Sequence, residues 1–338
     1  MPATMHDVAR LAGVSIKTVS NVINGYPHIR PATKQRVEDA IEQLGYHPNP
    51  TARSLRSGRT GMISLVIPEL RNAYFAELAD SVMRAAAEHD LSVLIEQFAD
   101  SRESELATLQ KPRTAMVDGI LYSVLALEQS DVDVIDGIEM PLVLLGERIF
   151  NGPRDHVTMQ NTEGVRAATE HILSLGRRRV MALGAHPGEV IGSAGLRLEG
   201  YRQAMDAAGL PIDENLIVNV GTWHRKDGAE AMRAFLDKGI DFDSIVAFND
   251  TLALGAVRVM QEAGIRVPDD VAVIGFDDVD ETRYSIPTLS TIDPGRDEIA
   301  RRAVDILLDR MEKDAKAEES AQEIDVPFQL VIRESTGG

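Results

Sequence analysis

Apolar residues recur at helical spacing in three stretches within the first 45 positions of the chain. Each stretch has the period of an amphipathic helix with one face suited to a small core. The apolar positions are Met5, Val8, Leu11 and Ala12, then Val19, Val22 and Ile23, then Val37, Ala40, Ile41 and Leu44. The short 13–15 link between the first two helices predicts helix-turn-helix geometry. A plain three-helix bundle has the same pattern and stays open at this point.

From residue 61 onward, short apolar runs alternate with amphipathic stretches. The runs predict strands over 63–67, 91–95, 119–122, 142–145, 180–183, 216–220, 244–248, 271–276 and 324–332. The amphipathic stretches predict helices over 74–88, 101–111, 164–175, 195–208, 227–238, 251–263 and 298–311. This alternation predicts parallel sheets covered by helices on both faces, and its two series predict two lobes.

We therefore expect an all-α headpiece, a hinge segment and a two-lobe α/β domain. The expected ranges are 1–47 for the helix-turn-helix domain, 48–60 for a hinge helix and linker, and 61–338 for the larger domain. Within the larger domain, the expected ranges are about 61–162 and 294–324 for lobe one and about 163–293 and 325–338 for lobe two.

Composition narrows the class of protein. The chain of 338 residues contains no cysteine, which excludes disulfides and thiolate zinc sites. No apolar run approaches the length of a membrane span, and the first twenty residues lack the apolar segment of a signal peptide. We therefore expect a cytoplasmic protein without a membrane partner. The formal net charge of −18 is uneven, because residues 1–60 carry +4 and the rest −22. A basic head on an acidic body favours DNA contact through the head alone.

The second helix carries side chains that suit DNA. Lys17 can bind guanine, Asn21 can bind adenine in a bidentate manner, and an exposed Ile16 can contact a thymine methyl group. With the apolar face turned inward, these residues are expected to face outward together with Thr18 and Ser20. Phosphate contacts are expected from Thr18, Ser20 and Asn24.

A second candidate DNA element lies in residues 48–58. This stretch is too short and polar to form a stable isolated helix, which indicates a segment that folds on docking. Leu55 is its one large apolar residue, and Arg53 and Arg56 flank it. A leucine between arginines suits a wedge in the minor groove. An ordinary interdomain linker with one stray leucine is the alternative.

These segments together resemble the headpiece and hinge helix of the lactose-repressor (LacI) family. The matching segments are 4–9, 12–15, 18–20, 22–24, 45–46, 48–49 and 52–55. The resemblance implies that Ile16, Lys17 and Asn21 read bases and that Leu55 intercalates in the minor groove. It further implies DNA contacts at Thr4, Ser15, Thr18, Ser20, Asn24, His28, Ala52 and Arg53.

Polar residues follow the predicted strands of the body. They occur at 72–75, 146–148, 193–197, 221–223, 249–250 and 277–278. Ligands of open parallel sheets bind at the carboxyl ends of the strands, and two facing lobes make the cleft between them the expected site. Carboxylates, an arginine and an indole ring suit a polyhydroxylated ligand. Trp223 could instead be a packing anchor, and Asn249 and Asp250 could cap the next helix, which is the reading that we favour for Asp250.

The body resembles the effector domain of the same family, which is similar to periplasmic sugar-binding proteins. The matching segments are Gly195 to Tyr201, Phe248 to Asp250 and Gly275 to Asp277. The resemblance implies effector contacts at Tyr74, Phe75, Glu147, Asn161, Arg197, Trp223, Asn249 and Asp277.

We expect a ligand-responsive, sequence-specific transcriptional regulator, namely a repressor of carbohydrate-utilisation genes. It would bind a pseudo-palindromic operator in double-stranded DNA, with a sugar in the cleft controlling the hinge helices. The chain shows no apolar heptads after residue 332, so a homodimer is expected. A sugar-binding protein without a transcriptional role is the alternative. No phosphate-binding loop, metal-ligating histidine pair or nucleophile elbow occurs, so we expect no catalytic residue, cofactor or metal.

Overall fold

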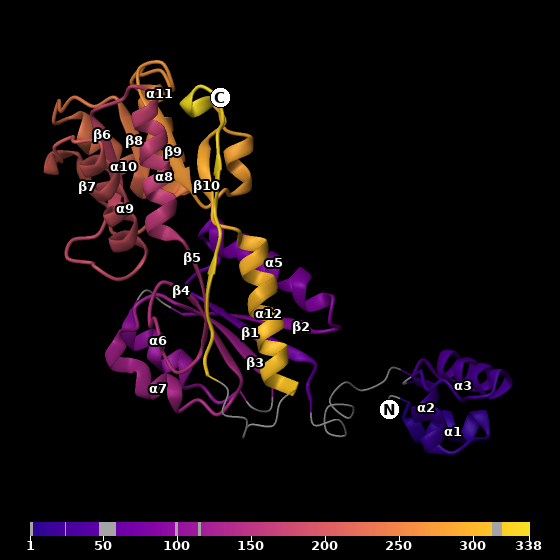
Figure 1. Ribbon diagram of the computed structural model, residues 1–338. Coiled ribbons are helices and arrows are strands. Elements are labelled where there is room, and N and C mark those ends of the chain that lie inside the picture. The colour runs from indigo at the N-terminus through magenta and orange to yellow at the C-terminus, as the bar shows by residue number, and fades with distance from the viewer. Residues whose placement is uncertain (1–2, 24, 47–58, 99–100, 114–115, 313–319) are drawn as a thin grey trace. The chain divides into compact units, whose positions relative to one another are not determined.

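The computed structural model describes residues 3–23, 25–46, 59–98, 101–113, 116–312 and 320–338. The chain divides into two compact units, Met1–Gly61 and Met62–Gly338. Figure 1 shows the helical first unit and the larger second unit, which consists of two lobes. Each unit has a hydrophobic core of its own.

The first unit contains three helices. They are α1 (Met5–Ala12), α2 (Ile16–Ile23) and α3 (Pro31–Leu44). Thr4 and Asp7 form a capping box at the start of α1, and Gly13 ends that helix in the left-handed conformation with φ of 64°. Ser15 caps α2, because its hydroxyl accepts the backbone N–H of Thr18 at 3.1 Å. The three helices close around a core that includes Val8, Val19 and Val37, as the apolar stripes predict.

Lobe one is built on a six-stranded parallel sheet in the order β11-β5-β4-β3-β1-β2. Its strands are β1 (Met62–Ile67), β2 (Ser92–Gln97), β3 (Gly119–Val124), β4 (Leu142–Gly146), β5 (Asp155–Met159) and β11 (Glu323–Val326). Its helices are α5 (Ala73–Ala87), α6 (Arg102–Leu109), η1 (Gln129–Asp131), α7 (Val132–Asp136) and α12 (Arg296–Glu312).

Lobe two has a second six-stranded sheet in the order β12-β10-β9-β8-β6-β7, parallel except for β12. Its strands are β6 (Val180–Ala185), β7 (Ile217–Asn219), β8 (Ser244–Ala247), β9 (Ala272–Phe276), β10 (Ser290–Asp293) and β12 (Gln329–Val331). Its helices are α8 (Asn161–Ser174), α9 (Ser193–Ala207), η2 (Glu214–Leu216), α10 (Arg225–Leu236), α11 (Asp250–Glu262), η3 (Asp280–Arg283) and η4 (Glu334–Thr336).

The chain passes between the lobes three times. The crossings follow β5, β10 and β11, so each lobe is assembled from segments far apart in the sequence. Helices α5 and α12 lie side by side (Figure 1), and Ser81 donates a hydrogen bond to Asp297 across them at 2.6 Å. One continuous apolar cluster contains side chains of both lobes, among them Leu145 and Phe248. These features make the two lobes parts of one unit.

Three strand predictions differ from the structure. No strand was predicted over 290–293, where β10 lies. The strand β5 was not expected, because it contains Asp155, His156 and Thr158 and thus lacks a continuous apolar run. All three polar side chains are buried, and two of them are bonded: Arg310 pairs with Asp155 at 2.7 Å, and the His156 ring lies 2.8 Å from the Glu323 carboxylate. The prediction of a single strand over 324–332 is also wrong. Pro327 interrupts it, so β11 joins one sheet and β12 the other.

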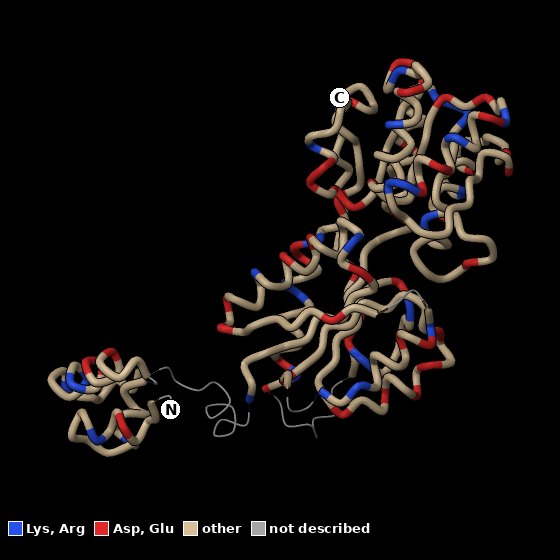
Figure 2. The backbone as a smooth tube through the Cα atoms, turned by 180° about the vertical axis from the view of Figure 1, so that it is seen from behind, with Lys and Arg blue, Asp and Glu red and all other residues tan. Residues whose placement is uncertain are grey.

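Charged residues of both signs are spread over both lobes of the second unit (Figure 2). Many form ion pairs between neighbouring turns of one helix, such as Arg301 with Glu298 on α12. Such exposed pairs contribute little to the free energy of unfolding. Within the part of the chain that the structure describes, no helix is both long enough and apolar enough to cross a membrane.

Candidate functional site

The helix α2 carries the candidate base-reading residues of the first unit. Ile16 and Lys17 are exposed, Thr18 and Asn21 are half-buried, and all four lie on a helix of eight residues. Ser20 is only 6% exposed, so the expectation that it faces outward is wrong. The helix is short and packs against both α1 and α3, which widens its buried side beyond the stripe of large apolar residues.

The other candidates in the first unit are exposed at helix ends or in the loop after α2. They are Thr4, Ser15 and His28. Thr4 and Ser15 also act as helix caps, so their hydroxyls already have partners within the headpiece. The remaining candidates lie outside the described residues, namely Asn24, Ala52, Arg53 and Leu55.

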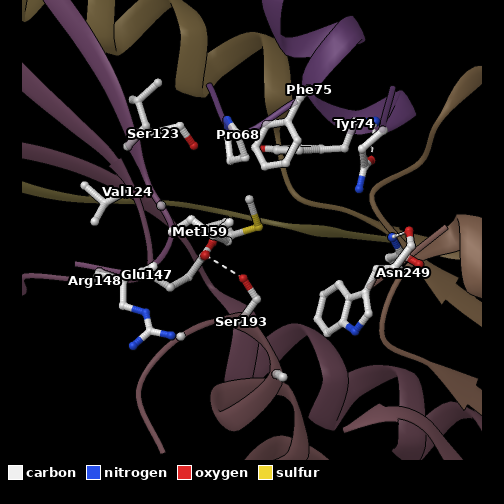
Figure 3. A pocket seen from close by; sticks show the side chains of 18 of the residues that line it. Pro68, Tyr74, Phe75, Ser123, Val124, Glu147, Arg148, Met159, Ser193 and Asn249 are labelled. Carbon is white, nitrogen blue, oxygen red and sulfur yellow. Dashed lines mark hydrogen bonds between the residues drawn. The ribbon is translucent and has the colours of Figure 1, made fainter. Parts of the chain in front are cut away.

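The second unit contains a cavity of about 460 Å³ at the carboxyl ends of its parallel strands. Seven of the eight predicted effector contacts line it, namely Tyr74, Phe75, Glu147, Arg197, Trp223, Asn249 and Asp277. Residues from both lobes form the wall, as Figure 3 shows for Ser123 and Arg148 of lobe one and Ser193 and Asn249 of lobe two.

Arg197 is the centre of a buried network on the lobe-two side. Its Nε donates to Oδ1 of Asn161 at 2.7 Å, and its Nη1 donates to the backbone carbonyl of Phe248. The guanidinium lies 3.8 Å from the ring centroid of Phe276 and 3.7 Å from the Asp277 carboxylate. Asn161 does not line the cavity, which differs from the expected direct contact. It holds Arg197 in place from behind the wall.

Hydrogen bonds hold Trp223 in place at its indole ring and at its backbone carbonyl. Its indole N–H donates to the carbonyl of Gly184 at 3.0 Å, and its own carbonyl accepts the side-chain amide of Asn249 at 3.1 Å. A side chain at position 184 would collide with Leu252, so glycine there allows the indole ring to lie close to the backbone of residue 184. The indole is half-buried and lines the cavity, where an aromatic face can stack on a sugar ring.

The structure assigns different roles to Asn249 and Asp250, which the sequence left open. Asn249 caps α11, because its Oδ1 accepts the backbone N–H of Leu252 at 2.9 Å, and it also lines the cavity. The favoured reading of Asp250 as a cap is wrong. Its carboxylate instead accepts the hydroxyl of Thr291 at 2.7 Å and the N–H of Val279 at 3.0 Å. It is fully buried, and the largest influence, its burial, raises its pKa well above the usual value.

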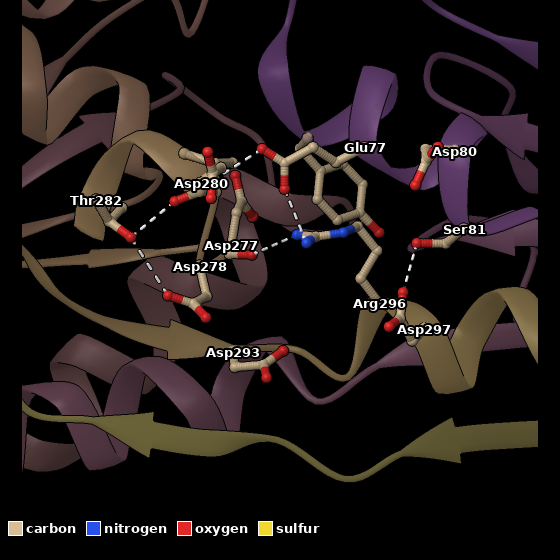
Figure 4. Close-up of polar contacts among 12 residues, drawn as sticks. Glu77, Asp80, Ser81, Asp277, Asp278, Asp280, Thr282, Asp293, Arg296 and Asp297 are labelled. Carbon is tan, nitrogen blue, oxygen red and sulfur yellow. Dashed lines mark hydrogen bonds and ion pairs between the residues drawn. The ribbon is translucent and has the colours of Figure 1, made fainter. Parts of the chain in front are cut away.

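The carboxylates in the wall lie in different surroundings. Ser193 donates to Glu147 at 2.6 Å and so joins the two lobes (Figure 3). Burial raises the pKa of Asp277 to about 7, although Arg197 and Arg296 act against the shift. Arg296 also pairs with Glu77 at 2.7 Å and donates to the backbone carbonyl of Asp277 at 3.1 Å (Figure 4). A buried carboxylate network thus borders the cavity at the junction of the lobes.

Further polar residues in the wall were not named as candidates from the sequence. They are Glu69, Ser123, Glu128, Thr158, His186 and Glu189. Ser123, His186 and Glu189 occur at or just after the ends of β3 and β6, so the strand-end rule could have found them. Thr158 carried no such signal, because its strand was not predicted.

Comparison with known proteins supports both units. A model described as bacterial regulatory proteins of the lacI family matches residues 4–49. A model described as a periplasmic binding protein-like domain matches residues 169–336. Among curated proteins, the HTH-type transcriptional regulator DegA of Bacillus subtilis is 33% identical over 99% of this chain and 98% of its own. The ribose operon repressor of Escherichia coli is 34% identical over 91% of this chain and 93% of its own.

The chain belongs to the lacI family of bacterial regulatory proteins. Like its relatives, this lacI-family protein is a DNA-binding regulator of transcription and not an enzyme. The predicted fold class, a helix-turn-helix headpiece with a two-lobe periplasmic-binding-protein-like body, is confirmed.

Several solved structures also resemble this lacI-family regulator. A chain described as a LacI-family transcriptional regulator from Sanguibacter keddieii is 51% identical, with a TM-score of 0.76, over 82% of this chain and 100% of that one. The lac repressor dimer bound to operator and the anti-inducer ONPF is 27% identical, with a TM-score of 0.85, over 99% of both chains. The transcriptional regulator CelR in complex with cellobiose is 30% identical, with a TM-score of 0.71, over 98% and 99%.

Proposed function

We propose that this regulator represses carbohydrate-utilisation genes and that an uncharged sugar in the cavity of the second unit controls its binding to DNA. The cavity carries the proposal, because it combines aromatic faces with carboxylate, amide and hydroxyl groups from two lobes. Tyr74 and Phe75 meet edge to face at 5.3 Å on one wall, and Trp223 belongs to the wall of lobe two. Sugars are bound by such rings and by polar groups that fork onto their hydroxyls.

The charge of the wall favours an uncharged ligand over a phosphorylated one. Among the lining residues described, the carboxylates are Glu69, Glu128, Glu147, Glu189 and Asp277, while the arginines are Arg148 and Arg197. Each nitrogen of the Arg197 guanidinium already donates to an atom of the protein. A phosphate group would therefore meet an excess of negative charge with few free donors.

We further propose that the protein binds a pseudo-palindromic operator as a homodimer in the cytoplasm. A dimer would place two headpieces on the two half-sites of one DNA duplex. The structure of the lac repressor dimer on its operator, which covers 99% of this chain, supports this arrangement. The proposed DNA contacts are those expected from the sequence on α2, at the headpiece caps and in the hinge segment, with Ser20 placed less favourably by its burial.

The test of this function uses the single tryptophan of the chain, Trp223. The purified full chain would be titrated with neutral mono- and disaccharides while the indole emission is followed. Operator fragments, selected from random duplex DNA with the same protein, would then be bound with and without each sugar. We expect one sugar to change the emission saturably and to change operator affinity. A sugar that binds without altering operator affinity would support the solute-binding alternative instead.

The variant Glu147→Gln gives a gentler test of the cavity than replacement of Arg197. Arg197 holds Asn161 and the backbone of Phe248, so its loss would disturb folding as well as binding. Glu147 can be replaced by glutamine with its bond to Ser193 kept. We expect weaker sugar binding and unchanged operator affinity without sugar. Equal sugar affinity in the variant and the wild type would remove Glu147 from the site.

A further inference from the structure

Three buried polar atoms in the cavity wall have no hydrogen-bond partner within the described protein. They are Nε of Arg148, Oγ1 of Thr158 and Nε2 of His186. Thr158 as a whole is only 2% exposed. Buried polar groups are almost always satisfied, so several unsatisfied groups on one cavity wall indicate a ligand that supplies the missing partners.

The carboxylate of Glu189 contacts two of these three residues. The His186 ring nitrogen Nδ1 donates to the Glu189 carboxylate at 2.8 Å, which leaves Nε2 on the other side of the ring. Arg148 of lobe one lies 3.8 Å from the same carboxylate, and the backbone N–H of Ala194 donates to it at 3.2 Å. Burial is the largest influence on Glu189 and acts to raise its pKa, but the bonds to His186 and the charges of His186 and Arg148 keep that pKa below the usual value.

The backbone leaves space for this arrangement. Gly192 has φ of 115°, and a Cβ atom there would lie 2.5 Å from the Glu189 carboxylate and 2.8 Å from the Arg148 guanidinium. The conformation favours glycine at this position, and any larger residue would also push aside the ends of the two side chains beside it. The contact between Arg148 and Glu189 joins the two lobes, so the arrangement exists only where both lobes meet.

These groups extend the cavity wall beyond the Arg197 network, and Trp223 lies between the two. Its ring centroid is 5.5 Å from that of His186, and the Arg197 guanidinium lies 5.2 Å from the indole. Figure 3 shows Arg148 and Asn249 on opposite sides of the cavity, with Met159 between them. Thr158 follows Val157, which pairs with Leu145 at the end of β4, the strand from which Glu147 and Arg148 extend. The cavity thus has two polar sides, one around Arg197 and Asp277 and one around Arg148, Thr158, His186 and Glu189.

The size of the cavity agrees with two sugar rings. Its volume of about 460 Å³ falls within the range of roughly 300–1,000 Å³ that small-molecule sites have. A single hexose has roughly a dozen heavy atoms and is small for a site of this size. The second polar side offers a donor at Arg148, the ring nitrogen Nε2 at His186, and a hydroxyl at Thr158 that can donate or accept. The carboxylates of Glu147 and Glu189 disfavour an anionic group there.

We propose that the cavity holds an uncharged disaccharide, with one ring against Arg197, Asp277 and Trp223 and the other in a second subsite formed by Arg148, Thr158, His186 and Glu189. This inference rests on the proposed sugar effector and adds the length of the ligand and the residues that select it. In the second subsite, the hydroxyls of the outer ring satisfy the three unpartnered atoms.

The test compares disaccharides with their own monosaccharides on the full-length wild-type protein. The probes are cellobiose, maltose, lactose, sucrose and xylobiose, with glucose, galactose, fructose and xylose as their constituents. Binding is measured by indole emission and by isothermal titration calorimetry. We expect at least one disaccharide to bind about tenfold or more tightly than either constituent, since the second ring adds several hydrogen bonds.

Two variants of the second subsite then locate the difference. We expect Arg148→Met to weaken binding of that disaccharide about tenfold while leaving the monosaccharide dissociation constant unchanged. We expect His186→Ala to weaken disaccharide binding by a similar factor, and because the His186 ring packs against Trp223, this variant is judged on the disaccharide alone. Arg166→Met is the matched control, because Arg166 is an exposed arginine on α8 outside the cavity wall. Asp277→Asn is the contrasting variant and should weaken both ligands.

The outcomes separate the two proposals. Equal affinity for a disaccharide and its monosaccharide, or equal weakening of both by the Arg148 variant, would overturn the second subsite and leave the sugar effector standing. Failure of every sugar to bind the wild-type protein would overturn the proposed sugar effector, and the second subsite with it.

Discussion

The guanidinium of Arg197 is occupied by its own protein before any ligand is present. It contacts Asn161, the carbonyl of Phe248 and the ring of Phe276, and it lies near Asp277. The side chain thereby fixes the relative positions of three segments that line the cavity. Glu147 makes fewer contacts, and among the described residues its hydrogen-bond partner is Ser193. Residues of the same wall thus contribute differently, some by holding the wall together and others by offering free lone pairs.

Lys17 is the clearest single test of base reading in the headpiece. It is exposed on α2 and forms no ion pair with a described residue of the first unit, so replacement should leave the fold intact. We expect Lys17→Ala to cost about 1–3 kcal/mol of operator affinity and to relax discrimination at one base position. The measurement is binding to the operator and to a set of single-base variants. A uniform loss on all sequences would place Lys17 at the phosphates instead.

Asp277 makes stability depend on pH. Burial raises its pKa from 3.8 to about 7, so the folded state holds a proton that the unfolded state releases between these values. The contribution of this group to the free energy of unfolding therefore falls as pH rises from about 4 to about 7. We expect Asp277→Asn, which cannot ionise, to gain stability relative to the wild type over this range, by an amount on the order of 2–4 kcal/mol.

The measurement is urea unfolding of both proteins at a series of pH values from 4 to 8. Asp250 lies nearby and its pKa is also raised by burial, so the two carboxyls titrate together. For that reason the comparison uses the difference between variant and wild type rather than either curve alone. A difference that stays constant with pH would contradict a buried, protonated Asp277.

Helices and strands differ in how well local pattern predicts them. The helices of the first unit begin and end at residues whose side chains or conformations require it, such as the capping box at Thr4 and the left-handed Gly13 and Gly45. In the body, neighbouring helices approach so closely that only glycine fits at the contact. Gly200 of α9 faces the backbone of Thr162, and Gly255 of α11 faces the backbone of Arg225. These close contacts fix the pairs α8 with α9 and α10 with α11.

We expect Gly255→Ala to destabilise the second unit by about 1–3 kcal/mol, because the new methyl group would collide with the backbone carbonyl of Arg225. Backbone atoms cannot move aside as a side chain can, so the two helices must separate. Gly221→Ala is the matched control, since no atom lies within 4 Å of a Cβ at that position. Denaturant midpoints of the two variants provide the measurement. Equal stability of both would contradict the close packing of α10 and α11.

The two lobes of the second unit meet through contacts on several sides of the cavity. Glu69 of lobe one lies 3.1 Å from His224 of lobe two, and the N–H of Asp280 donates to Glu77 at 2.9 Å. Ser193 and Glu147 form a further bond between lobes. A ligand among these contacts touches both lobes at once. Its binding can therefore favour one arrangement of the lobes over another, provided that its affinity differs between them.

This coupling predicts reciprocal effects of sugar and DNA. If the sugar changes operator affinity by a factor of about 5–150, saturating operator must change sugar affinity by the same factor. We would measure operator binding at zero and saturating sugar, and sugar binding at zero and saturating operator. Non-specific DNA of equal length is the control, and it should leave sugar affinity nearly unchanged. A factor of one in both directions would contradict the role of the sugar as an effector.

The sequence by itself determined the headpiece, the alternation of strands and helices, and the residue types at the carboxyl ends of the strands. These features depend on local period, caps and turns, which neighbouring residues specify. Tertiary structure alone decided the rest. It buried the polar strand β5 between two others and divided residues 323–331 between two sheets. It also made Asp250 a link from α11 to β10 and to the loop after β9 in place of a helix cap. It also brought Arg148 and Glu189 together from different lobes. Such contacts join positions far apart in the chain, and no local pattern records them.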